Sequence, residues 1–260
     1  MSRGLKRLLR SITWKIFPHA DLRLRTPVRR FYIPVRKLTD FASLQEIFIE
    51  RTYAAFLPQL TGITSWVDLG CNSGYFSLNL LDSVEHPEGC HALLVDAHPI
   101  CCQTARAAVE VNGLNTRFAV INQLVGPAAA SAEFFQARGT QGSSIFKPEA
   151  KAKAVHVPSA PFGKVLSWHV LPGRDLVKID IEGAEKHLFE NEADVLATFR
   201  YGLAEWHAPH WTGEQMRDWL FKRNARILAV QSSGLETGAG AQDSFDGRLG
   251  VVLWRTASER

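Results

Sequence analysis

The stretch W-V-D-L-G-C-N-S-G-Y-F-S, residues 66–77, passes from an apolar strand into a helix through a glycine-bearing turn. Gly70 and Gly74 bracket this turn, and Asp68 stands at the end of the strand. In the dinucleotide fingerprint G-x-G-x-x-G, the middle glycine lets the backbone approach a pyrophosphate. Here the equivalent position holds Asn72, which tolerates left-handed geometry but carries a side chain. The turn therefore predicts a cofactor without a pyrophosphate.

The sequence on either side of this turn alternates between strand-like and helical runs. Strand-like runs occur at Ser65–Leu69, Ala92–Val95, Arg117–Ile121, Leu176–Ile181 and Gly202–Trp206. After the second of them, Pro99 begins a helix and Asn112-Gly113 ends it, with each residue type at the terminus it prefers. Such alternation predicts a parallel sheet with helices on both faces.

Two parts of the chain depart from the alternation. Between residues 126 and 174 it loosens into short strand candidates at Ala132–Gln136 and Ala154–Val157. Near the end, Arg226–Val230 and Leu249–Trp254 follow each other without a helix between them. This second pair predicts an antiparallel finish to the sheet.

The composition is that of an ordinary globular protein, with 46% hydrophobic and 22% charged residues among 260. No run approaches the roughly 18 apolar residues that a membrane span needs. Lys6, Arg7 and Arg10 interrupt the only candidate for the apolar region of a signal peptide. The four cysteines (Cys71, Cys90, Cys101 and Cys102) form no C-x-x-C pair, which favours reduced thiols in a cytoplasmic protein over disulfides or a zinc site.

Basic residues are concentrated at the start of the chain. Residues 1–30 carry nine basic side chains and one acid, a charge of +8 that leaves −4 for the rest of a chain with net charge +4. Within them, residues 4–17 place five aliphatic side chains on one helical face and Lys6, Arg7 and Arg10 opposite. This basic amphipathic pattern predicts a helix that lies on an anionic membrane surface, docks on a partner, covers a core edge or forms a mobile tail. We therefore divide the chain into an arm, residues 1–39, and a domain, residues 40–260.

Acidic residues stand at the ends of the second and fourth predicted strands. Asp96 ends the second strand, where a carboxylate can accept hydrogen bonds from both hydroxyls of a ribose or cap the next helix. The fourth strand lies in D-L-V-K-I-D-I-E-G-A-E, residues 175–185, and Lys178, Asp180 and Glu182 share one of its faces. In a doubly wound sheet, ligands bind beyond the carboxyl ends of the strands. Asp180 and Glu182 are therefore expected at a ligand site.

The fifth predicted strand contributes L-A-E-W-H, residues 203–207, in which Glu205 and His207 share a face. If this strand neighbours the fourth, both side chains converge on the cleft that holds Asp180. Glu185 has a simpler interpretation, because a carboxylate in the first turn of a helix complements the helix dipole.

Together these stretches resemble a known family. V-D-L-G-C-N-S-G-Y-F-S is similar to the first motif of class I S-adenosylmethionine-dependent methyltransferases, and L-V-K-I-D-I-E-G-A-E followed by L-A-E-W-H resembles the signature of the FkbM family. The resemblance spans residues 40–256 and leaves out the basic arm. It implies an α/β, Rossmann-like, doubly wound sheet of seven mostly parallel strands with an antiparallel last strand. It also implies S-adenosylmethionine as the donor and a hydroxyl of a sugar, a glycolipid or a macrolide-like natural product as the acceptor.

The resemblance and the strand ends together give two sets of candidate site residues. The expected cofactor-binding residues are Asp68, Gly70, Asn72, Gly74, Tyr75, Asp96 and Asn122. The expected catalytic residues are Asp180, Glu182, Glu205 and His207. An alcohol is a poor nucleophile until its proton is being removed, so we expect His207 or Asp180 to act as the general base. Glu182 and Glu205 would bind the acceptor or orient the base.

Three alternatives remain open from the sequence. Asp180, Glu205 and His207 could instead hold a divalent metal that lowers the pKa of the acceptor hydroxyl. The basic arm could serve a nucleic-acid methyltransferase, but the fourth strand carries D-I-E-G in place of a D/N-P-P-Y motif, and acids there would repel phosphates. A non-catalytic module that docks through residues 1–30 is disfavoured by the acids at the expected strand ends.

Overall fold

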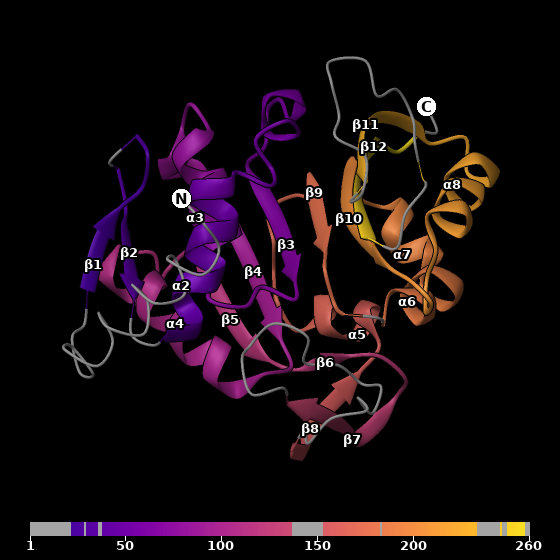
Figure 1. Cartoon of the computed structure of the whole chain (residues 1–260), viewed down its shortest axis with the longest axis horizontal. Helices are drawn as coiled ribbons and strands as arrows, with labels where there is room; N and C mark the ends of the chain where they lie inside the picture. Colours follow the sequence, from indigo (N-terminus) through magenta and orange to yellow (C-terminus); the bar gives the residue numbers. More distant parts are fainter. Residues whose placement is uncertain are drawn as a thin grey trace, which may run out of the picture.

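The computed structural model describes residues 22–28, 30–35, 38–136, 153–182, 184–232, 245 and 249–257. Its centre is a seven-stranded sheet in the order β11-β12-β10-β9-β3-β4-β5 (Figure 1). The strands are β3 (Ser65–Leu69), β4 (His91–Asp96), β5 (Phe118–Asn122), β9 (Leu176–Ile179), β10 (Tyr201–His207), β11 (Arg226–Ser232) and β12 (Leu249–Arg255). β12 runs antiparallel to both neighbours, and the other pairs are parallel. The predicted doubly wound fold with an antiparallel last strand is confirmed.

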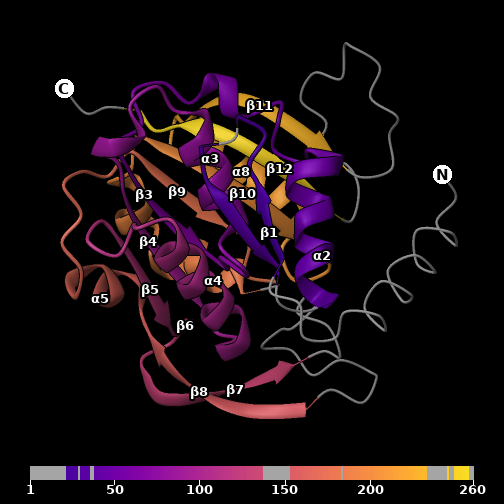
Figure 2. The same cartoon turned by 90° about the vertical axis from the view of Figure 1, so that its left-hand side faces the viewer.

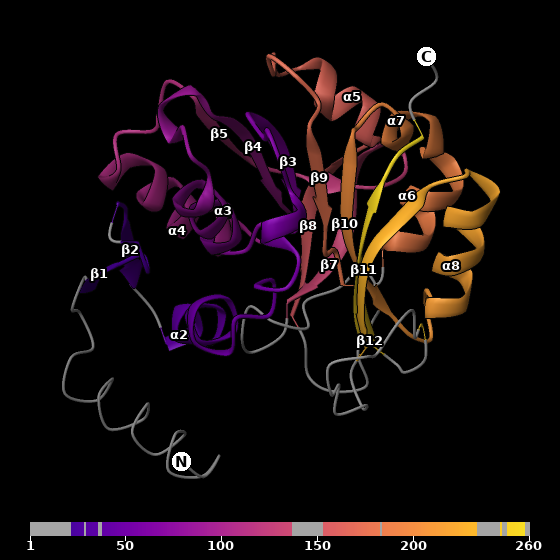
Figure 3. The ribbon, with the colours of Figure 1, turned by 90° about the horizontal axis from the view of Figure 1, so that it is seen from above.

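Helices cover both faces of this sheet. α3 (Tyr75–Ser83) and α4 (Pro99–Val111) lie on one face, and α5 (Phe162–Ser167), α6 (Glu185–Asn191), α7 (Ala193–Ala197) and α8 (Gly213–Lys222) lie on the other (Figure 3). Within the described ranges, no helix has both the length and the apolar character that crossing a membrane requires.

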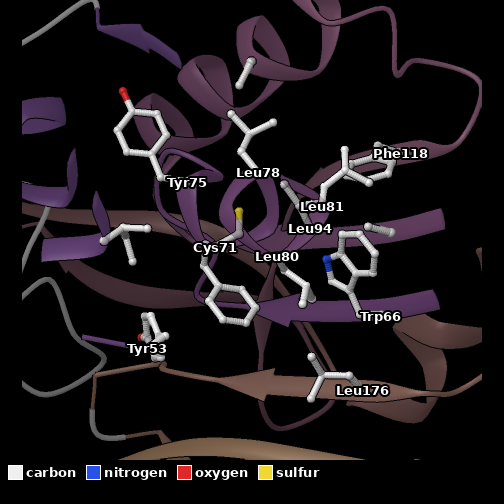
Figure 4. Packing of buried hydrophobic residues seen from close by; sticks show 14 of the residues in the cluster. Tyr53, Trp66, Cys71, Tyr75, Leu78, Leu80, Leu81, Leu94, Phe118 and Leu176 are labelled. Carbon is white, nitrogen blue, oxygen red and sulfur yellow. The ribbon is translucent and has the colours of Figure 1, made fainter. Parts of the chain in front are cut away.

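Each face of the sheet has its own hydrophobic core, because successive side chains on a strand point to opposite faces. On β3, Trp66 packs into the core beneath α3 and α4, whereas Val67 and Leu69 pack into the core beneath the helices of the other face. Figure 4 shows Trp66 near Leu80 and Phe118 in the first of these cores. The Trp66 and Phe118 rings meet edge to face with centroids 5.3 Å apart. A strand buried on both sides fixes the position of the turn that follows it.

A hairpin precedes the expected domain. β1 (Leu22–Arg25) pairs antiparallel with β2 (Tyr32–Val35), and α2 (Leu38–Leu44) and the π-helical segment η1 (Gln45–Glu50) follow. Short 3-10 turns, η2 (Leu57–Gln59) and η3 (Pro87–Gly89), occur in later connections. Ile33 and Val35 are buried in the first core, so residues before position 40 contribute to the core of the domain expected at residues 40–260. The predicted helix at residues 4–17 lies outside the described residues.

A separate three-stranded sheet is inserted between β5 and β9. It has the order β6-β8-β7 and consists of β6 (Leu124–Val125), β7 (Ala129–Gln136) and β8 (Lys153–Ala160). β7 and β8 contain the short strand candidates that the sequence predicts in this region. Figure 2 shows this pair standing off the central sheet, at the bottom of the view.

β9 ends two residues before the predicted end of its strand. The ladder stops at Ile179, and the Asp180 N–H then donates to the Leu69 carbonyl across the tip of β3 at 3.0 Å. Glu182 takes a left-handed conformation with φ 51°. The expectation of a strand through residue 181 is therefore wrong, because the chain turns as soon as it passes the end of β3. This turn frees the side chains of Asp180 and Glu182 from the sheet.

Candidate active site

The carboxyl ends of β9 and β10 bring the four predicted catalytic residues together. His207 lies at the centre, with its Nε2 atom 3.8 Å from Asp180 Oδ1, 3.9 Å from Glu182 Oε2 and 3.9 Å from Glu205 Oε2. The convergence that the strand alternation predicts is therefore present. The catalytic roles of these residues stay predictions.

A fourth carboxylate holds the other side of the His207 ring. His207 Nδ1 lies 2.9 Å from Oε1 of Glu185, whose side chain is fully buried. Glu185 is the first residue of α6 and also accepts the Ile181 N–H at 3.2 Å. The prediction placed Glu185 at the start of a helix, which is correct, but did not foresee its contact with His207. That contact depends on how α6 sits beside β10, which residue spacing does not show.

These carboxylates determine the charge of His207. Burial by itself lowers the pKa of His207, but the hydrogen bond to Glu185 and its charge outweigh burial. With Asp180 and Glu182 adding to the effect, the pKa of His207 rises to about 10. His207 is thus an imidazolium at neutral pH when no ligand is bound.

Glu205 carries a perturbed carboxyl group on the same face. Burial raises the pKa of Glu205 to about 8, and the charge of Asp180 acts in the same direction. The charge of Lys178 and a hydrogen bond from Tyr53 oppose the rise. The Tyr53 hydroxyl donates to Glu205 Oε1 at 2.5 Å and fixes that carboxyl group. Tyr53 was missed from the sequence because no chemical pattern marks the segment in which it lies.

Lys178 is the second residue that the sequence interpretation left without a role. Its Nζ atom lies 3.1 Å from Asp180 Oδ2 and 3.5 Å from Asp68 Oδ1, and it donates to the Gly70 carbonyl at 3.0 Å. Only 4% of the side chain is exposed. Burial lowers the pKa of Lys178, but the charges of Asp180 and Asp68 raise it more, so the ammonium is retained. A lysine within an otherwise apolar strand was the signal for this buried ion pair.

Three residues of the glycine turn adopt left-handed backbone geometry, which Asn72 tolerates as expected. Gly70, Asn72 and Gly74 have φ values of 72°, 47° and 76°. A Cβ atom on Gly70 would lie 1.6 Å from the Asp180 carbonyl oxygen, so this glycine lets the end of β9 approach the turn. Gly74 is the N-cap of α3 and packs closely on Leu94. A Cβ atom on Gly74 would lie 3.1 Å from the Leu94 side chain. Both glycines therefore have structural duties besides any contact with a cofactor.

Asp96 lies directly beside this turn. Its two carboxylate oxygens accept the backbone N–H of Asn72 at 2.8 Å and of His98 at 2.7 Å. The alternative that Asp96 caps the next helix is wrong, because His98 is the N-cap of α4 and accepts the Ile100 N–H. Each carboxylate oxygen keeps a second lone pair, so Asp96 can still accept hydrogen bonds from ribose hydroxyls. Burial raises the pKa of Asp96 to about 6, which leaves it ionised at neutral pH.

The remaining predicted cofactor residues lie around or beneath the turn. Asn122 donates to the carbonyls of Asp96 and Ala97 at 2.9 Å and orders the loop after β4. Asp68 is fully buried and accepts a hydrogen bond from the Ser77 hydroxyl at 2.8 Å. Its other carboxylate oxygen pairs with Lys178, so its role in the structure is to hold that ammonium. The Tyr75 hydroxyl donates to the Pro34 carbonyl and leaves only the ring to face the turn. Of the seven predicted residues, Asn72, Asp96 and Asn122 thus present polar groups around the turn.

Two cavities adjoin this cluster. A small one of about 30 Å³ lies between the glycine turn, Tyr53, Lys178 and Asp180. The expected methyl donor is larger than this cavity, so its binding must displace part of the wall that α2 and η1 form. A groove of about 360 Å³ adjoins Glu205. Its polar lining comes from Gln45, Glu46, Glu50, Thr52, Gln231 and Ser232, and none of the described lining residues is basic. Glu46 borders both cavities.

Three residues of the cluster bring together donor atoms of the types that bind a divalent metal. One donor atom from each of Asp180, Glu205 and His207 lies within 4.8 Å of the other two. Metal-bound histidines commonly donate their second ring N–H to a carboxylate, as His207 does to Glu185. The predicted metal ligands therefore do converge and could hold a divalent ion.

Comparison with protein families gives one match. Residues 68–227, more than half of the chain, match the model of the methyltransferase FkbM domain. No curated protein sequence matches this chain.

Comparison with solved structures gives many similar chains, at low identity. The METTL16 MTase domain is 12% identical with a TM-score of 0.47, and the match covers 82% of this chain and 69% of that one. A putative O-methyltransferase from Klebsiella pneumoniae is 16% identical with a TM-score of 0.45 and coverages of 81% and 80%. TrmK of M. capricolum, in complex with S-adenosyl-homocysteine, is 10% identical with a TM-score of 0.45 and coverages of 78% and 66%. At these values no activity is carried over from any of them.

Proposed function

This chain belongs to the FkbM methyltransferase family, and from that premise we propose that it is an O-methyltransferase whose acceptor is a hydroxyl of a sugar, a glycolipid or a macrolide-like natural product. As a member of that family it is an S-adenosylmethionine-dependent methyltransferase. The observation that carries the finer proposal is His207, which Glu185 orients and which faces three further carboxylates at the end of β10.

The chemistry requires little more than positioning and a base. The sulfonium donor supplies an electrophilic methyl group, so the protein must orient the acceptor oxygen and take its proton. His207 Nε2 faces the carboxylates of Asp180, Glu182 and Glu205, because Nδ1 is held by Glu185. Asp180 is the weaker candidate for the base, since its Oδ2 atom already pairs with the Lys178 ammonium at 3.1 Å. We therefore assign the base to His207.

The protonation of His207 fits a base that becomes active only when the donor is present. Without ligand, its pKa of about 10 keeps the ring protonated. We expect His207 to lose this proton when a second cation, the sulfonium, binds beside the same carboxylates, because like charges oppose each other. Its Nε2 atom is then neutral and can accept the proton of the acceptor hydroxyl.

The other carboxylates have supporting roles in this proposal. Glu205 lines the acceptor groove and is fixed by Tyr53, so it is placed to bind the acceptor. Glu182 lies on the solvent side of the cluster, with 36% of its side chain exposed. Its charge helps to keep His207 protonated until the methyl donor binds. Asn72, Asp96 and Asn122 are the groups that would hold the nucleoside part of the donor.

The groove beside Glu205 favours an acceptor rich in hydroxyl groups. Amides, hydroxyls and carboxylates can each bond to an alcohol, either as donor or as acceptor. A phosphate-bearing acceptor would meet Glu46 and Glu50 without a basic side chain among the described lining residues. This supports a hydroxylated small molecule or glycan over a nucleic acid.

Transfer of a labelled methyl group tests the proposal. We expect purified protein with ¹³C-methyl S-adenosylmethionine to label hydroxylated acceptors from a panel of sugars, glycolipids and macrolides. The ¹³C shift of the product distinguishes a methyl ether from an N-methyl group. The full-length protein with single-stranded and duplex oligonucleotides is the comparison, and labelled oligonucleotides with unlabelled alcohols would contradict the proposal.

The metal version of the mechanism is tested in the same reaction. Assays with EDTA, and with Mg²⁺ or Mn²⁺ added back, separate the two versions. The mechanism based on His207 expects no change with EDTA, because Lys178 and His207 already balance part of the negative charge. Loss of transfer with EDTA that a divalent ion restores would instead support a metal held by Asp180, Glu205 and His207.

A further inference from the structure

The small cavity beside the glycine turn takes part of its wall from the segment that precedes β3. Ser43 of α2 and Glu46 of η1 line this cavity together with Lys178 and Asp180. We propose that Ser43 and Glu46 bind the amino-acid end of the methyl donor, Ser43 its carboxylate and Glu46 its ammonium group. The inference rests on S-adenosylmethionine as the donor and does not depend on the acceptor proposed above.

Ser43 carries a buried hydroxyl group that lacks a hydrogen bond. Only 4% of the residue is exposed, and its Oγ atom has no hydrogen-bond partner among the described residues. The other hydroxyl groups in the cavity lining already donate within the protein, those of Tyr53, Ser73 and Tyr75. Most buried polar groups in folded proteins are hydrogen-bonded. An unbonded hydroxyl in a cavity wall therefore marks a place where a ligand can supply the partner.

The position of the cavity in the sheet indicates which end of the donor reaches it. In the sheet, β3 lies between β4, which ends at Asp96, and β9. Lys178 and Asp180, on and directly after β9, line the cavity, whereas Asp96 does not. A donor with its ribose at Asp96 and its methyl group toward His207 must extend from β4 across the end of β3. Its amino-acid end is then the part that lies nearest to Ser43.

The charges in the cavity lining match an amino acid. The amino-acid end of the donor carries a carboxylate and an ammonium group. The Ser43 hydroxyl can donate to the carboxylate, and the Glu46 carboxylate can accept from the ammonium group. Lys178 lies in the same lining, and its positive charge favours an incoming carboxylate. Asp180 already pairs with Lys178 at 3.1 Å, so we assign the ammonium group to Glu46.

The α2–η1 segment is attached at both ends, although the donor must displace part of it. On one side of Ser43 and Glu46 in the sequence, Asp40 accepts the Ser73 hydroxyl at 3.0 Å. On the other side, Tyr53 donates to Glu205. These two hydrogen bonds limit the displacement to the stretch between them. Ser43 and Glu46 lie in that stretch, so they still border the enlarged cavity.

Calorimetric titration with three ligands, without any acceptor, tests the inference. S-adenosylhomocysteine has the whole amino-acid end, its decarboxylated analogue keeps only the ammonium group, and methylthioadenosine has neither. Ser43→Ala should weaken S-adenosylhomocysteine about tenfold to hundredfold, the range of a hydrogen bond to a charged group, and leave the other two ligands unchanged. Glu46→Gln should weaken S-adenosylhomocysteine and its decarboxylated analogue about tenfold and leave methylthioadenosine unchanged.

Ser65→Ala is the matched control. Ser65 is also fully buried with a hydroxyl that has no partner among the described residues, but it begins β3, at the opposite end from the glycine turn. This variant should bind all three ligands as the wild type does. Wild-type affinity for S-adenosylhomocysteine in Ser43→Ala would overturn the inference. An equal loss for methylthioadenosine would also overturn it, because it would show a general disturbance of the site in place of a lost contact with the amino-acid end.

Discussion

His207→Gln should lower the turnover number for methyl transfer by about 10²–10⁴-fold, the contribution that a general base typically makes. Glutamine can keep a hydrogen bond to Glu185 but cannot accept the proton of the acceptor. Affinity for S-adenosylhomocysteine, whose sulfur is neutral, should stay within a few-fold of the wild type, since His207 does not lie among the groups around Asp96. Single-turnover transfer and calorimetry with S-adenosylhomocysteine measure the two quantities separately.

Two further variants make this result specific. His156→Gln removes an exposed histidine from β8, outside the catalytic cluster, and should leave transfer unchanged. Glu185→Gln removes the carboxylate that contributes most to raising the pKa of His207, so that pKa falls. The rise of kcat/KM with pH, which follows deprotonation of the free protein's base, should then shift to lower pH. Wild-type turnover in His207→Gln would refute the assignment of the base.

Lys178→Met should destabilise the folded protein by about 3–5 kcal/mol, because it leaves buried carboxylates without their cation. Asp68 is fully buried, and Lys178 lies 3.5 Å from its Oδ1 atom, which has no hydrogen-bond partner among the residues that the structure describes. Asp180 loses the same ammonium at 3.1 Å. Chemical denaturation of wild type and variant gives the difference in the free energy of unfolding.

A surface lysine provides the matched control for this variant. Lys186 pairs with Glu190 at 3.9 Å on an exposed face of α6, so Lys186→Met should cost less than about 1 kcal/mol. Adding Asp68→Asn to Lys178→Met should recover part of the lost stability, since the uncompensated carboxylate is then removed. If Lys178→Met and Lys186→Met cost the same, the buried ion pair is not the stabilising contact we describe.

The residues of the catalytic cluster that lie on or directly after the strands could be predicted from the sequence. Carboxyl ends of parallel strands meet at one edge of a sheet, and alternate residues share a face, so Glu205 and His207 were correctly expected beside Asp180. The same alternation placed Lys178 on the face of Asp180. The contact of Lys178 with Asp68 could not be predicted in this way. It depends on the register between β3 and β9, in which Asp68 pairs with Lys178.

What could not be predicted depends on packing between distant segments. Glu185 meets His207 only because α6 begins beside the end of β10, across 22 positions of sequence. Tyr53 reaches Glu205 across 152 positions, from a segment whose composition signals only a core. The early end of β9 was also missed, because an apolar run continues through Ile181 while the chain has already turned at Asp180. Local patterns therefore identified the reacting groups, but not the residues that orient them.

Proton release on donor binding is the measurement that tests the account most directly. At about pH 9, Glu205 is mostly ionised and His207 still mostly protonated, given pKa values of about 8 and about 10. Calorimetric titration in buffers of different ionisation enthalpy counts the protons released. We predict that cationic S-adenosylmethionine releases more protons than neutral-sulfur S-adenosylhomocysteine, and that His207→Gln abolishes this difference. Equal release for both ligands in the wild type, or a difference that persists in His207→Gln, would contradict the claim that His207 becomes a base when the sulfonium binds.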